Sequence, residues 1–127
     1  MARIIVSVRS ILLAVPLLAT APFTANAVER GDFLLENAKQ LGALCGANAD
    51  VAAIHMCEGF LVGVHRTLQS IENALNQKFY CIPPDANVTR DSAARDFAAW
   101  AAATPTAATM PPVDGALQWA SHAYPCH

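Results

Sequence analysis

Four cysteines constrain this chain more than any other feature of its sequence. Cys45, Cys57, Cys81 and Cys126 all follow residue 27, where an export signal would end. Thiols in an oxidising compartment pair with one another, and an even number in about a hundred residues favours two disulfides. Zinc sites use closely spaced pairs such as C-x2-C, which this sequence lacks. We therefore expect all four cysteines to be paired, with no metal and no cofactor.

The N-terminus carries the three zones of a secretory signal. Two arginines supply positive charge, residues 11–18 are almost wholly apolar, and Ala25-Asn26-Ala27 forms a small-x-small cleavage site. The apolar run is interrupted by prolines and is shorter than the roughly 20 residues that span a bilayer. We predict a signal peptide over residues 1–27, cleaved between Ala27 and Val28, and a periplasmic product that is not inserted in the membrane.

Charge excludes one class of partner. The chain has ten Asp and Glu and eight Lys and Arg, and two of the arginines lie in the predicted signal. Residues 28–127 therefore carry a formal charge of −4. This balance argues against nucleic acid, whose binding draws on clustered Lys and Arg. Residues 28–127 are enough for one small domain.

An apolar stripe in the middle of the chain predicts one long helix. Its members recur every three or four residues, which fits a helix and no strand, and they are Cys57, Leu61, Val64, Leu68, Ile71, Leu75 and Phe79. Polar residues, among them Glu72, fill the opposite side. Asp50 can cap the start, and Pro83-Pro84 ends the run because proline supplies no N–H. We expect a helix over about residues 51–79.

Three shorter helices are expected around the long one. The first covers residues 32–44, with Asp32 as its N-cap. The next opens at Thr89 or Asp91, and the last begins at Pro111-Pro112, which suits a first helical turn. The inward-facing residues of the last helix are expected to be Val113, Ala116, Leu117 and Ala120. Because no alternating strand pattern is present, the predicted fold class is all-α: a small four-helix domain stapled by two disulfides.

The long helix also selects the disulfide pairing. At about 1.5 Å per residue it is roughly 40 Å long, which holds Cys57 and Cys81 near opposite ends. A disulfide needs Cα atoms within about 7 Å, so these two residues cannot pair. Cys45 is tied to the start of the same helix by a short turn and cannot reach Cys81 either. The remaining pairing is Cys45–Cys57 with Cys81–Cys126.

Two glycines on the long helix invite an explanation. Gly59 and Gly63 lie four residues apart, and each costs about 1 kcal/mol relative to alanine inside a helix. Close approach of a neighbouring helix is favoured over a ligand contact. No catalytic grouping stands out, because the oxidised cysteines lack a reactive thiolate and the histidines form no metal-binding pair. We therefore expect that the protein is not an enzyme.

The residues around the cysteines form an ordered set. Leu34-Leu35 precedes Cys45, Cys57-Glu58-Gly59-Phe60 is followed by Gly63, and Phe79-Tyr80-Cys81-Ile82-Pro83 comes next. This arrangement resembles the Rap/Tai family of immunity proteins associated with type VI secretion. The resemblance implies a small helical periplasmic protein over residues 28–127 that binds a toxic peptidoglycan amidase and blocks its active site.

We accordingly expect a binding module whose partner is a secreted cell-wall amidase toxin. The loops over residues 82–88 and 105–114 are the predicted contact surfaces, and the candidate contact residues are Pro84, Asp85, Asn87, Thr106 and Met110. A periplasmic stress chaperone or envelope factor of similar fold is the alternative function. A homodimer is an open alternative for the assembly.

Overall fold

The computed structural model of this chain describes residues 27–127, and these residues fold into helices without a strand. The α-helices are α1 (Ala38–Cys45), α2 (Val51–Leu75), α3 (Arg90–Ala103) and α4 (Pro112–Ala123). Short 3-10 helices, η1 (Arg30–Leu34) and η2 (Pro105–Ala108), precede α1 and α4. The predicted all-α class is confirmed. The predicted signal lies outside the described residues, apart from Ala27, and Val28 packs against the core.

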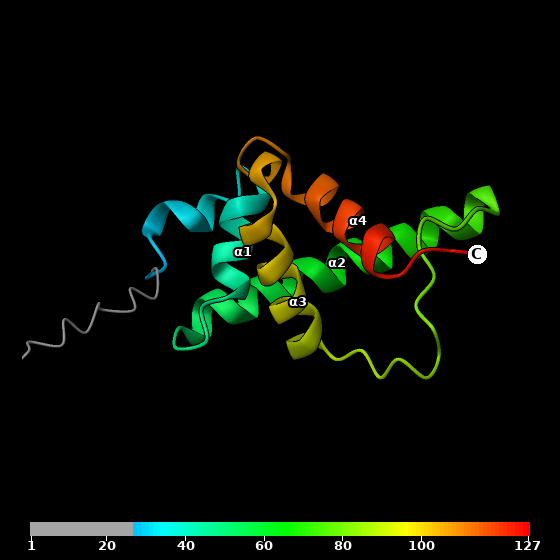
Figure 1. Cartoon of the computed structure of the whole chain (residues 1–127), viewed down its shortest axis with the longest axis horizontal. Helices are drawn as coiled ribbons and strands as arrows, with labels where there is room; N and C mark the ends of the chain where they lie inside the picture. Colours follow the sequence, from blue (N-terminus) through cyan, green and yellow to red (C-terminus); the bar gives the residue numbers. More distant parts are fainter. Residues whose placement is uncertain (1–26) are drawn as a thin grey trace, which may run out of the picture.

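Helix α2 is the long helix that the apolar stripe predicted. Asp50 caps it by accepting a hydrogen bond from the Ala53 N–H at 3.0 Å. The helix covers 25 residues and crosses the molecule in Figure 1 (green). Its predicted end at Phe79 is wrong, because Asn76 adopts a left-handed conformation (φ 51°) that terminates the helix after Leu75. The prolines that follow are therefore not the residues that end it.

The prediction of one helix over residues 32–44 is also wrong. Leu35 has a left-handed conformation (φ 52°), which separates η1 from α1. The N-cap of α1 is Asn37, whose side chain accepts a hydrogen bond from the Gln40 N–H at 3.0 Å. Asp32 lies within η1 and accepts a hydrogen bond from the Glu29 N–H at 2.9 Å.

The two C-terminal helices begin where proline and threonine signals place them. Thr89 caps α3 by accepting a hydrogen bond from the Ser92 N–H at 3.1 Å, and Pro112 occupies the first turn of α4. The expected inward face of α4 is partly wrong, since Val113 is 47% exposed. Trp119 is buried instead, together with the predicted Ala116 and Ala120.

Helix α1 lies at the centre of the packing, in contact with α2, α3 and α4. The fully buried Phe97 of α3 fills the space beside it. Phe97 packs edge-on against Trp119, with ring centroids 5.7 Å apart, and lies 5.6 Å from Trp100. Both tryptophans therefore serve the core, which joins α3 to α4 through aromatic contacts.

One disulfide joins α1 to α2 and the other joins the segment after α2 to the C-terminus, which confirms the predicted pairing. Cys45 at the end of α1 bonds to Cys57 in α2, with Cα atoms 5.1 Å apart. Cys81 bonds to Cys126 near the C-terminus, with Cα atoms 5.0 Å apart. The last turns of α2 extend past the shorter helices (Figure 1), so Ile71 and Leu75 are exposed and not inward-facing as predicted.

The glycines that permit close helix packing are not the predicted pair. Gly59 and Gly63 are exposed, and a Cβ added at either would meet nothing within 4 Å. A Cβ on Gly42 would lie 2.5 Å from the Ala101 Cβ, so α1 and α3 touch through these two small residues. Gly115 of α4 has an equally close contact with α1. The prediction for Gly59 and Gly63 is wrong because they face away from the core.

A connecting segment, residues 76–89, runs from α2 to α3, and we call it the strap. A buried carboxylate anchors its first part: Glu72 is only 5% exposed and accepts a hydrogen bond from the Phe79 N–H at 2.8 Å. Lys78 contributes an ion pair with Glu72 at 3.1 Å. The hydrogen bond from Phe79 is the largest cause that holds the pKa of Glu72 below its ordinary value, against the opposing effect of burial.

Replacing glycine with alanine at one packed position and at one exposed position tests which glycines the helix packing requires. Gly42→Ala should destabilise the fold by about 1–3 kcal/mol, because its new methyl group collides with α3. Gly59→Ala should stabilise it by up to about 1 kcal/mol, since alanine favours the helix and the added Cβ meets open space. Urea unfolding followed by circular dichroism measures both changes. Equal effects of the two substitutions would contradict the packing described above.

Replacing Glu72 with glutamine should give a stability loss that depends on pH. Because folding lowers the pKa of Glu72, its carboxylate stabilises the fold above the ordinary glutamate pKa of about 4.3. That contribution is lost as the pH falls through the lower folded-state value. Glu72→Gln should therefore cost about 1–3 kcal/mol near neutral pH, and less at about pH 3.

The unfolding free energy, measured from about pH 3 to neutral pH, tests whether the Glu72 carboxylate anchors the strap. Glu36→Gln, at an exposed glutamate, is the control. A deficit for Glu72→Gln that stays constant with pH would show that the charge does not hold the strap.

Candidate functional site: a groove between α2, α4 and the strap

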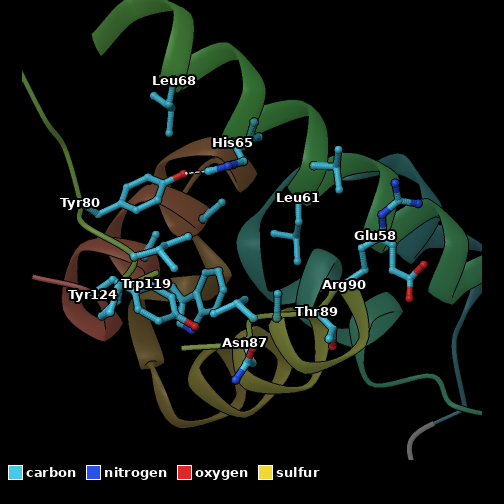
Figure 2. Close-up of a pocket in the computed structure, with 18 of the residues that line it drawn as sticks. Glu58, Leu61, His65, Leu68, Tyr80, Asn87, Thr89, Arg90, Trp119 and Tyr124 are labelled. Atoms are coloured by element: carbon cyan, nitrogen blue, oxygen red, sulfur yellow. Dashed lines mark hydrogen bonds between the residues drawn. The ribbon is translucent and has the colours of Figure 1, made fainter. Parts of the chain in front are cut away.

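A groove with a volume of about 440 Å³ lies between α2, the strap and α4. Figure 2 shows its two sides: Leu61, His65 and Leu68 project from α2, while Tyr80 of the strap and Trp119 of α4 lie opposite. The start of α3 closes one end. This volume falls within the range of ligand-binding clefts in proteins, roughly 300–1,000 Å³.

The surface of the groove is mainly apolar. Helix α2 supplies branched aliphatic side chains at helical spacing, and α4 supplies the small Ala116 and Ala120 beside Trp119. Trp119 also packs edge-on against Tyr124, with ring centroids 6.1 Å apart. Ile82 of the strap lines the groove and remains 38% exposed, so an approaching molecule can reach it. Apolar surface that stays open to solvent in this way is typical of binding sites.

A neutral polar pair lies within the apolar lining. His65 Nδ1 and the Tyr80 hydroxyl share a hydrogen bond of 2.6 Å, drawn as a dashed line in Figure 2. Burial lowers the pKa of His65, and the neighbouring charge of Arg66 acts in the same direction. Burial likewise raises the pKa of Tyr80. Near neutral pH both groups are therefore uncharged, and the pair joins α2 to the strap.

The end of the groove beside α3 carries the charged groups. Figure 2 shows Glu58 of α2 and Arg90 of α3 side by side there. Hydrogen bonding with the Asp91 carboxyl is the largest cause that raises the pKa of Glu58. The positive charge of Arg90 acts in the opposite direction. Two carboxyl groups and one guanidinium thus give this end a mixed charge, and the groove interior has none.

The structure separates the predicted contact residues into two places. Pro84 and Asn87 line the groove, and Asp85 lies exposed between them on the strap. Thr106 is exposed on η2, away from the groove lining. Met110 has a structural role, because its carbonyl accepts a hydrogen bond from the Ala38 N–H at 2.8 Å and so joins the start of α4 to α1.

Sequence reasoning missed the residues that shape the groove. Glu72 was expected on the polar side of α2, whereas it is buried and anchors the strap. Its position four residues after Leu68, on the line of the apolar stripe, is the signal that could have identified it. His65, Tyr80 and Trp119 gave no comparable signal, because long-range folding alone brings them together.

Within residues 27–127, no group of three or more His, Cys, Asp or Glu side chains is placed to hold a metal ion. Across the same described residues, no helix combines the length and the apolar character needed to cross a membrane.

Comparison with known proteins adds one match. The sequence model of the Rap1a immunity proteins matches residues 37–126, which include all four helices and both disulfides. No curated protein matches, and no solved structure matches. Since the matched segment covers well over half of the chain, the chain belongs to the Rap1a immunity protein family.

Proposed function

We propose that this protein is a periplasmic immunity protein that binds a secreted peptidoglycan amidase and occludes its active site. The family match over residues 37–126 is the observation that carries the proposal, because immunity proteins act on effector proteins. The predicted signal peptide and the two disulfides suit an oxidising envelope compartment. The amidase is the effector class implied by the resemblance of the sequence to the Rap/Tai proteins.

The groove and the strap form the surface that we propose for the effector. This surface is mainly apolar, and the exposed strap residues Ile82, Pro83 and Pro84 form its rim. Prolines restrict the backbone, and the strap is anchored by Glu72 at its start and capped by Thr89 at its end. A rim held in this way loses little conformational entropy when it binds, which favours affinity.

Inhibition would follow from steric exclusion rather than chemistry. A stable interface of this kind buries about 1,600 Å² in total, which is more than the groove alone offers. The effector would therefore cover the strap as well as the parts of α2 and α4 that line the groove, with its own cleft closed against them. The uncharged His65–Tyr80 pair would supply hydrogen-bonding groups inside this contact.

Aspartate substitutions at three exposed aliphatic residues identify the contact surface. Ile82 lies in the groove, Val113 lies on the other predicted loop, and Val51 lies at the start of α2, outside both. Ile82→Asp should weaken effector binding about tenfold or more, because it places a charge in an apolar contact. Val113→Asp and Val51→Asp should leave binding unchanged. Titration calorimetry with a peptidoglycan amidase effector that binds the wild-type protein measures all three.

Loss of binding with Val113→Asp alone would move the interface to residues 105–114. If the wild-type protein binds none of the secreted peptidoglycan amidases tested and does not protect cells that express them in the periplasm, the proposed function is wrong.

A further inference from the structure

The two disulfides differ in exposure. Cys45 and Cys57 are both 0% exposed and lie within the core formed by α1 and α2. Cys81 and Cys126 are both exposed to solvent. Thiol–disulfide exchange requires a thiolate to reach a disulfide sulfur, so accessibility sets which bond reacts first. A soluble reductant can therefore reach Cys81–Cys126, whereas the core shields Cys45–Cys57.

The exposed disulfide, Cys81–Cys126, is also the last attachment of the strap to the rest of the protein before α3 begins. Phe79 and Tyr80 are held by Glu72 and His65, and Cys81 donates a backbone hydrogen bond to the Tyr124 carbonyl at 2.8 Å. Within the described part of the chain, the hydrogen bonds of residues 82–88 remain among themselves. Beyond Cys81, the strap therefore depends on this bond until Thr89 caps α3.

The same bond holds the C-terminal side of the groove. Tyr124 lines the groove and packs against Trp119, and Cys126 follows it by two residues. With the disulfide broken, the strap and the chain beyond α4 would be joined by the Cys81–Tyr124 backbone hydrogen bond without a covalent tie, and both residues 82–88 and the chain beyond α4 would gain freedom. By contrast, the core around Phe97 has its own buried disulfide, so helix packing does not require the exposed one.

We propose that Cys81–Cys126 is a redox-sensitive clasp: oxidised, it holds the strap and the C-terminal segment in place around the groove, and reduced, it releases them while the helical core stays folded. A dithiol reductant supplies the electrons. Its thiolate attacks one sulfur, the Sγ–Sγ bond breaks, and a mixed disulfide forms. The second thiol of the reductant then displaces the remaining protein sulfur. The protein gains two electrons and two protons as two thiols, and the reductant becomes a disulfide.

Graded reduction of the purified oxidised protein tests this clasp. Dithiothreitol is added in steps, free thiols are trapped by alkylation, and the labelled cysteines are identified by mass spectrometry. Cys81 and Cys126 should be labelled at least about tenfold faster than Cys45 and Cys57. At that stage far-ultraviolet circular dichroism should retain the helical signal, and acrylamide quenching of tryptophan fluorescence should rise as Trp119 becomes accessible.

Two variants assign these signals. Trp119→Phe should abolish the rise in quenching, because Trp100 lies outside the groove lining. The double substitution Cys81→Ser with Cys126→Ser should reproduce the quenching of the partly reduced protein while it keeps the helical signal. Labelling of Cys45 and Cys57 first or at the same rate would overturn the proposal, and so would selective reduction that leaves Trp119 quenching unchanged. These readouts need no effector, so they are independent of the proposed function.

Discussion

The continuity of α2 is the constraint on which the rest of this fold depends. Its 25 residues correspond to about 36 Å at a rise of about 1.5 Å per residue. The first part of the helix is tied to α1 by Cys45–Cys57, and the strap that folds back along it is tied to the C-terminus by Cys81–Cys126. If α2 were broken, the distance between the two disulfides would no longer be fixed. The groove would then lose one of its walls.

Different parts of α2 contribute to the core and to the groove. The first half of α2 packs with α1 and α3 around a buried disulfide, where small residues such as Gly42 and Ala101 let the helices touch. From Glu58 to Leu68 the helix lines the groove, and beyond that Glu72 anchors the strap. Stability thus resides mainly at one end and the candidate binding surface at the other. This arrangement lets the binding surface change without loss of the core.

Local sequence signals determined much of the fold. The stripe of α2, the caps at Asp50 and Thr89, and the disulfide pairing were all predictable, because each depends on residue spacing or on one backbone hydrogen bond. The breaks at Leu35 and Asn76 were not, since both depend on left-handed backbone conformations that tertiary contacts select. The packing glycines were missed because Gly59 and Gly63 form a motif, whereas Gly42 acts through a partner far along the chain.

The groove could be predicted only in part. Pro84 and Asn87, which the sequence offered as partner contacts, line the groove, whereas the buried charge of Glu72 and the His65–Tyr80 pair depend on how the strap folds back over α2. Hydrogen–deuterium exchange of the oxidised protein tests the continuity of α2 directly. The account predicts that the amides between Gly59 and Leu75 exchange as one protected unit, with fraying only at the C-terminal turn. Faster exchange at residues 59–63 than on both sides would show two shorter helices and would contradict it.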